Sequence, residues 1–179
     1  MDEMSTDMLS DEGEIESETG GDSGNDAPQG MERRLVFRLL SHWRELVGRD
    51  LAGEHDYPSF SELDPETIPD IWEHAFVLDI SGHMEDPLFR LVGPKFAAYS
   101  PIDLRNLPVS QAPRDSLVEK SVDFAQEVIS REVPISRGGE FLKPDGVKVL
   151  YRSIILPMSD DGITVSGLFG AANCREETV

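Results

Sequence analysis

The chain has 179 residues, a length that suits one folded domain with some chain to spare. Its 35 Asp and Glu outnumber its 16 Lys and Arg, and the resulting net charge of −19 would repel a nucleic-acid backbone. A single cysteine excludes an internal disulfide framework, and the sequence has neither a secretory leader pattern nor an apolar run long enough to span a membrane. We therefore expect a cytoplasmic protein that binds neither nucleic acid nor membrane.

Residues 1–30 contain ten acidic residues, no basic residue and no aromatic residue. Such a composition cannot bury enough apolar area to offset the loss of chain entropy, so it predicts a disordered acidic tail. The tail either keeps the protein solvated or meets a basic surface. Beyond it we expect three segments: a helix at 31–49, one folded domain at 50–174 and a short C-terminal tail at 175–179.

An amphipathic helix is predicted at residues 31–49, because apolar residues recur on one arc of a helical wheel and Gly48 follows the last of them. The apolar arc consists of Leu35, Val36, Leu39, Leu40, Trp43, Leu46 and Val47. The opposite arc carries Arg34, Arg38 and Arg44. A face of Leu, Val and Trp this wide is not stable in water, so it packs against either the rest of the chain or another protein.

The middle of the chain predicts short elements. Residues 53–60 suit a loop, and Asp64-Pro65-Glu66 has the cap residue, the proline and the acid of a helix start. Pro69 is expected to strain or end that short helix. Two apolar runs, at 74–80 and 88–92, are separated by a loop and predict two antiparallel strands.

The second half of the chain predicts one long helix and three strands. Ser116 begins a capping-box pattern and the helical spacing of apolar residues continues, so we expect a single helix over 116–131. Strands are expected at 133–142, 147–158 and 163–173. The two turns between them each end in Asp-Gly, a pair that tolerates positive φ, so the three strands should form an antiparallel meander.

Five stretches of the sequence carry a family likeness. They are Trp43-Arg44, Leu63-Asp64-Pro65-Glu66 with Ile68-Pro69, Phe76-Val77-Leu78-Asp79, Phe89-Arg90-Leu91-Val92-Gly93 and Leu156-Pro157-Met158-Ser159-Asp160-Asp161-Gly162. With the order of elements, they make the chain resemble a PAS domain, most closely the small stand-alone bacterial PAS proteins once grouped as a domain of unknown function. The resemblance implies an α+β PAS fold, with a five-stranded antiparallel sheet, helices over one face and an amphipathic helix in front. It also implies a sensory or interaction module, although the fold does not fix the signal.

In a PAS arrangement, the apolar side chains of the strands and helices converge between the sheet and the helices. The candidate cleft contains Phe76, Phe89, Phe96, Tyr99 and Phe124, with Arg90 and Arg152 as its polar groups. A cleft that holds a small ligand and a core that is filled by these rings share one sequence pattern, so both interpretations stay open.

The residues present disfavour haem, metal and flavin chemistry. Residues 116–131 contain no histidine for a haem iron, and the four histidines lack the i, i+3 or i, i+4 spacing of a metal pair. Asn173-Cys174-Arg175 has the letters of a photoactive flavin motif, but it lies at the end of the last expected strand instead of on a helix in mid-domain. The sequence has no phosphate-binding Gly-rich loop, zinc-peptidase helix or Gly-x-Ser-x-Gly elbow, so we expect no enzyme and leave the cofactor unknown.

The leading hypothesis is a non-enzymatic PAS sensory or regulatory module that acts through protein contacts in bacterial signalling. A small-ligand sensor is the first alternative and a small enzyme the second. We expect the N-terminal helix to pair two copies as a homodimer or to bind a signalling protein, with Leu39 and Trp43 near the centre of the contact and Leu40 and Leu46 beside them. The competing expectation is that this helix folds back on its own sheet.

Overall fold

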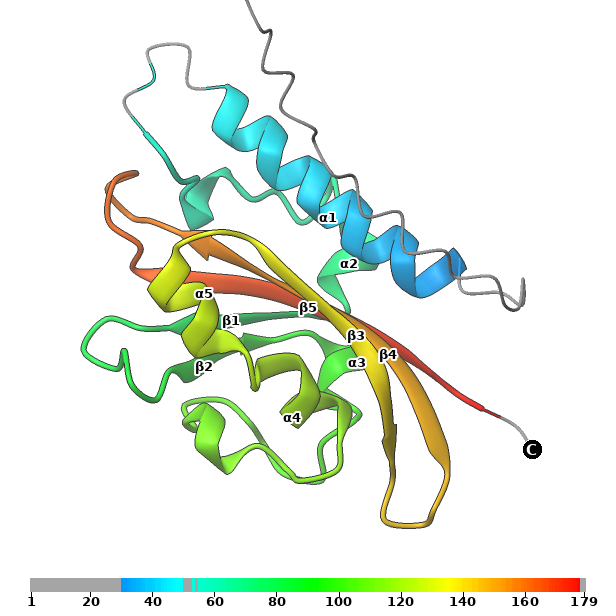
Figure 1. Cartoon of the computed structure of the whole chain (residues 1–179). Coiled ribbons are helices and arrows are strands. Elements are labelled where there is room, and N and C mark those ends of the chain that lie inside the picture. The colour runs from blue at the N-terminus through cyan, green and yellow to red at the C-terminus, as the bar shows by residue number, and fades with distance from the viewer. Residues whose placement is uncertain (1–29, 50–52, 54, 178–179) are drawn as a thin grey trace, which may run out of the picture.

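The computed structural model describes residues 30–49, 53 and 55–177, with side chains from residue 34 onward. The acidic tail predicted at the N-terminus lies outside these residues. Five antiparallel strands form one sheet, in the spatial order β2-β1-β5-β4-β3 (Figure 1). The strands are β1 (Ala75–Asp79), β2 (Leu88–Val92), β3 (Ile135–Leu142), β4 (Lys148–Met158) and β5 (Gly167–Glu176). The five-stranded antiparallel sheet expected from the sequence is therefore confirmed.

Helices lie on both faces of this sheet. They are α1 (Gly30–Gly48), α2 (Pro69–Trp72), α3 (Pro94–Ala97), α4 (Leu117–Val122) and α5 (Ala125–Arg131), with 3-10 turns η1 (Phe60–Glu62) and η2 (Val109–Gln111). Figure 1 shows α1 on one side of the sheet and α4 on the other. We call the side that faces α3, α4 and α5 the inner face, and the side that faces α1 the outer face.

Strands β4 and β5 are buried on both of these faces. Along β4, Ile155 belongs to the inner core, whereas Ile154 and Leu156 pack with α1. Along β5, Leu168 points inward and Phe169 outward. Because successive strand residues point to opposite faces, the odd-numbered residues of β5 pack against α1 and the even-numbered residues pack toward α4 and α5.

Helix α1 is held on the outer face by its apolar arc and by one hydrogen bond. Leu39 is 0% exposed and Leu46 is 2% exposed, both within the cluster that includes Phe169. The Trp43 Nε1–H donates to the carbonyl oxygen of Pro157 at 2.9 Å. The hydrogen-bonded pairing of β4 with β3 ends at Ile155. The Pro157 carbonyl lies beyond this ladder and therefore accepts its hydrogen bond from the Trp43 indole.

Three phenylalanine rings fill the space between the sheet and the inner helices. The Phe76 ring lies 4.8 Å from that of Phe96 and 6.5 Å from that of Phe89, measured between ring centroids, and all three side chains are fully buried. Gly170 on β5 leaves the room that Phe76 takes, because a Cβ there would lie 2.2 Å from the ring. The interior is thus packed by the aromatic side chains of the chain itself.

The long helix predicted over 116–131 is broken into α4 and α5. The Ser121 carbonyl, which would continue the helix, instead accepts a hydrogen bond from Ser153 Oγ on β4 at 3.3 Å. The Ser121 hydroxyl also bonds back to the Leu117 carbonyl at 2.5 Å, a contact that competes with helix continuation. Phe124 then leaves helical geometry, with φ −103° and ψ 12°, and buries its ring under the sheet.

Other boundaries differ from the sequence expectations. A 3-10 turn, η1, starts at Phe60, where a loop was predicted to end, and Pro69 starts α2 instead of ending a helix. Strand β5 begins at Gly167 and reaches Glu176, because residues 163–166 belong to a turn. In that turn the Asp161 carboxylate accepts backbone N–H bonds from residues 163 and 164. The positive φ expected at Gly146 and Gly162 is confirmed.

Replacing Gly170 by Ala tests the packing around Phe76. The new methyl group would also lie 2.9 Å from the Ile154 carbonyl, so we expect a loss of about 1–3 kcal/mol in the free energy of unfolding. Chemical denaturation measures it. Gly48→Ala is the control, because its Cβ has no atom within 4 Å. A Gly170→Ala protein as stable as the control would contradict the packing.

The turn at Asp161 predicts a pH dependence of stability. Hydrogen bonds from the backbone of residues 164 and 163 and from Ser159 lower the pKa of the Asp161 carboxyl to about 2. A depressed carboxyl pKa contributes stability that is present above the ordinary value of 3.8 and is lost as the pH falls toward 2. We therefore expect the wild type to lose more stability than Asp161→Asn between pH 4 and pH 2, in thermal melts. Parallel losses in the two proteins would contradict this.

Candidate functional site

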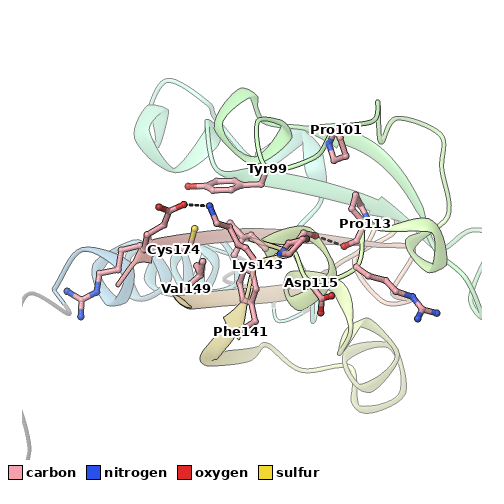
Figure 2. Close-up of a pocket in the computed structure, with 14 residues that line it drawn as sticks. Tyr99, Pro101, Pro113, Asp115, Phe141, Lys143, Val149 and Cys174 are labelled. Atoms are coloured by element: carbon pink, nitrogen blue, oxygen red, sulfur yellow. Dashed lines mark hydrogen bonds and ion pairs between the residues drawn. The ribbon is translucent and has the colours of Figure 1, made fainter. Parts of the chain in front are cut away.

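A pocket of about 440 Å³ lies at one end of the inner face, where the tip of the β3–β4 hairpin meets the C-terminal end of β5 (Figure 2). The loop after α3 and the segment before α4 close its other side. Its lining residues are Tyr99, Pro101, Pro113, Arg114, Asp115, Ser116, Leu117, Phe141, Lys143, Pro144, Val149, Cys174, Arg175 and Glu176. The volume falls in the range of small-molecule sites.

The floor of this pocket is apolar. Leu117, Phe141 and Val149 are buried and belong to the inner core, so the pocket is a gap in the core's edge. Phe141 and Val149 face each other because the two residues are paired in the β3–β4 ladder. The turn at Asp145-Gly146, with φ +86° at the glycine, reverses the chain just beyond them. The hairpin therefore brings two apolar side chains to the pocket from residues eight positions apart in the sequence.

Polar groups gather at the opposite end of the pocket. Figure 2 shows the Tyr99 ring over Cys174 and the Lys143 ammonium beside them. Burial, a hydrogen bond with the Cys174 thiol and the charge on Glu176 raise the pKa of the Tyr99 hydroxyl. Lys143 pairs with Glu176, and its Nζ lies 3.6 Å from an Asp145 carboxylate oxygen. This ion pair ties the hairpin turn to the end of β5.

The chemistry available in the pocket is that of binding. A tyrosine hydroxyl is ordinarily protonated near neutral pH, and the raised pKa of Tyr99 moves it further from ionisation, so it serves as a hydrogen-bonding group, here bonded to the Cys174 thiol. Lys143 is already paired with carboxylates. In residues 30–49, 53 and 55–177, no group of three His, Cys, Asp or Glu side chains is arranged to hold a metal ion. An apolar molecule with one hydrogen-bond acceptor would suit this lining.

The aromatic residues predicted for the cleft fall into two places. Phe76, Phe89 and Phe96 form the buried cluster described above, and Phe124 is buried at its edge with the Arg137 guanidinium 5.7 Å from the ring centroid. Tyr99 lies apart from them and lines the pocket. The rings thus pack the centre of the fold, and the open space is found at its rim.

The two arginines predicted as polar groups of the cleft both lie on the outer face. Arg90 is an extra residue in β2, because Leu78 pairs with Phe89 while Val77 pairs with Leu91. Its guanidinium binds Asp79, with Nη2 2.6 Å from Oδ2. Arg152 alternates with inner-face residues of β4 and lies over Gly138 of β3. Strand alternation from Phe89 and from the inner-face residues of β4 therefore keeps both arginines out of the cleft.

The helix residues expected at the centre of a partner contact face the sheet of the same chain. Leu39 and Leu46 are fully covered there, and Leu40 and Trp43 are partly buried against the same cluster. The competing expectation, that the helix folds back on its own sheet, describes this arrangement. A contact centred on Leu39 and Trp43 would require α1 to leave the sheet.

The exposed side of α1 carries more arginines than carboxylates, with Glu45 as its acidic residue, and one large apolar group. Phe37 is 63% exposed, and Arg34, Arg38 and Arg44 are exposed around it. Arg38 binds the Asp70 carboxylate of α2, with Nη2 3.0 Å from Oδ1. In the part of the chain that the structure describes, Arg34 and Arg44 have no ion-pair partner.

A groove of about 320 Å³ runs between α1 and the segment that leads into α2. Its lining residues are Phe37, Arg38, Ser41, His42, Glu45, Thr67, Ile68 and Ile71. The Nε2 atom of His42 is buried there and has no hydrogen-bond partner in the described residues. We name this groove and the exposed side of α1, from Arg34 to Arg49, the α1 face.

Sequence reasoning missed most of the pocket and the α1 face. Phe141, Lys143 and Val149 were assigned only to a hairpin, and Cys174 only to a strand end. No alternation marked Phe141 as inward-facing, because its neighbours in the sequence are Glu140 and the apolar Leu142. Phe37 stood alone on the polar arc of the helix, and that isolation was the sign of an exposed aromatic residue.

Comparison with solved structures finds neighbours at low sequence identity. Among solved structures, the chain is similar to a light-oxygen-voltage domain at 14% identity and a TM-score of 0.42, over 63% of this chain and 83% of that chain. It is similar to the PAS domain of an HTR-like protein from Haloarcula marismortui at 15% identity and a TM-score of 0.38, over 63% and 90% of the two chains. A PAS domain of a protein from Colwellia psychrerythraea shares 11% identity at a TM-score of 0.39, over 63% and 96%.

No curated protein matches the sequence. The sequence profile of the PAS domain family matches residues 31–173, which is most of the chain and includes α1 together with all but the end of β5. On that match, the chain belongs to the PAS domain family.

Proposed function

We propose that this chain is a non-enzymatic regulatory module of cytoplasmic signalling that acts by contacting a partner protein through the α1 face. The observation that carries the proposal is the position of Phe37. The apolar arc of α1 is used by its own sheet, yet this aromatic side chain is 63% exposed beside a groove. Exposed aromatic and arginine side chains are the groups that contribute most to protein interfaces.

The charge of the α1 face favours an acidic partner. Among the described residues of α1 and the turn that ends it, four exposed arginines, Arg34, Arg38, Arg44 and Arg49, outnumber the one exposed carboxylate, Glu45, on a chain whose net charge is −19. A protein with Asp and Glu around an apolar patch would complement it. A homodimer through the same face is the alternative, and it would bring two arginine-rich surfaces together.

The packed interior supports a role that does not depend on a large cofactor. Phe76, Phe89 and Phe96 occupy the centre between the sheet and the inner helices. PAS domains are generally sensory modules without enzyme activity, and the described residues contain no helix that is long and apolar enough to cross a bilayer. Haem stays disfavoured because residues 116–131 contain no histidine, and photoactive flavin because Cys174 lies on β5, where it contacts Tyr99.

A small-ligand sensor is the second candidate function, and the 440 Å³ pocket favours it. A small, largely apolar molecule there would touch Leu117, Phe141 and Val149 and accept a hydrogen bond from Tyr99. The bound molecule would also contact the segment before α4, so its binding would alter the position of the inner helices. This candidate and the first are compatible, since the pocket and the α1 face lie on opposite faces of the sheet.

The partner hypothesis is tested by affinity capture with three baits: the wild type, Phe37→Glu and Ile163→Glu. Ile163 is the matched control, because it is 64% exposed in the β4–β5 loop and belongs neither to α1 nor to the groove beside it. We expect an acidic protein that the wild type and the control retain, that Phe37→Glu loses, and whose retention weakens as salt rises. Equal retention by all three baits would contradict the proposed face, and a dimer that Phe37→Glu dissociates in sedimentation would favour self-association.

The sensor hypothesis is tested by native mass spectrometry and absorbance of protein purified under mild conditions. We expect the mass of the chain alone, with no visible absorbance. Val149→Trp adds a large side chain to the pocket floor and serves as the comparison. A co-purified molecule that is present in the wild type and absent from Val149→Trp would shift the proposal to the ligand sensor.

A further inference from the structure

One stretch of the same sequence has a charge and an apolar content that complement the α1 face. Residues 7–18 read Asp-Met-Leu-Ser-Asp-Glu-Gly-Glu-Ile-Glu-Ser-Glu, with six acidic residues and no basic one. Three apolar residues, Met8, Leu9 and Ile15, stand among the acids. Among the described residues, Arg34 and Arg44 lack ion-pair partners, and Phe37 is an exposed apolar contact between them.

We propose that residues 7–18 bind the α1 face of their own chain, with the carboxylates on Arg34, Arg44 and Arg49 and the apolar residues on Phe37 and the adjoining groove. This contact deepens the proposed function. The segment has the acidic and apolar character expected of the partner, so it occupies the face until a partner displaces it. Only this regulatory meaning rests on the proposed function; the contact itself is a property of the isolated chain.

The length of chain between the two parts allows the contact. Eleven residues, 19–29, join Glu18 to the first residue of α1. Extended, they reach about 40 Å, at up to 3.6 Å per residue. The 19 residues of α1 span about 28 Å, at 1.5 Å per residue, so residues 7–18 can return along any part of the helix.

The tether also favours this occupant over a separate acidic protein at equal intrinsic affinity. A short tether gives a local concentration on the order of millimolar, which exceeds the concentration of most cellular proteins. Attraction between charges at such a surface is screened by salt, because the Debye length falls from about 10 Å at 0.1 M to about 3 Å at 1 M. The contact should therefore weaken steeply as salt rises.

Paramagnetic relaxation in the full-length chain tests the proposal. A nitroxide is attached at Ser17→Cys in a Cys174→Ser background, and the amide signals of α1 are compared with those of α4 on the opposite face of the sheet. At low salt we expect a severalfold greater signal loss along α1 than along α4, and most of this difference should vanish at 1 M salt. Equal losses along both helices, or a pattern that salt does not change, would overturn the proposal.

A charge-reversal pair separates the α1 face from the overall charge. Arg34→Glu with Arg44→Glu should abolish the selective loss along α1. Arg105→Glu with Arg114→Glu changes the net charge equally, away from α1, and should preserve it. The amide spectra report whether each variant is folded. If a variant does not fold, the salt series on the protein with its native arginines tests whether residues 7–18 contact α1. Loss of the effect in both pairs would overturn the assignment to this face.

A mixing experiment identifies the source of the segment. Isotope-labelled chains without the nitroxide are mixed with unlabelled chains that carry it. Signal loss along α1 in the mixture would assign the contact to a second copy and overturn the intrachain proposal. If the contact is present and no acidic partner is captured through Phe37, the proposed function fails while this inference stands.

Discussion

The fold depends on the burial of β4 and β5 on both of their faces. Each of these strands supplies one set of side chains to the phenylalanine cluster and the alternate set to α1. Without α1, one apolar surface would face water, formed by Ile154, Leu156 and Phe169. The helix in front of the sheet is therefore part of the domain's core, and this position decides which of its sides is left for other molecules.

The same constraint explains how far the sequence could be interpreted. The order of elements, the two Asp-Gly turns and the inward phenylalanines were predictable, because each depends on local periodicity or on a residue that tolerates positive φ. The face of β4 was not predictable, since a strand that is apolar on both faces has no alternation to read. The break between α4 and α5 depends on the Ser121 carbonyl and Ser153 Oγ, a contact between residues that are distant in the sequence.

The site was less predictable than the fold for physical reasons. Arg90 was a candidate polar group of the cleft, but it follows the inward-pointing Phe89, so strand alternation places it on the outer face beside Asp79. The pocket forms where a hairpin tip, a strand end and a loop meet, and no local pattern records that meeting. The apolar arc of α1 was visible, but its occupant was not, because an arc that needs covering looks the same whether its own sheet or another protein covers it.

The central claim is that α1 packs within its own chain and presents its basic face outward. Chemical denaturation of Leu39→Ala at two widely separated protein concentrations tests it most directly. We expect a loss of about 2–5 kcal/mol in the free energy of unfolding, because Leu39 is fully buried, and the same loss at both concentrations. Near wild-type stability, or a loss that changes with protein concentration, would contradict the account and place Leu39 in a contact between chains.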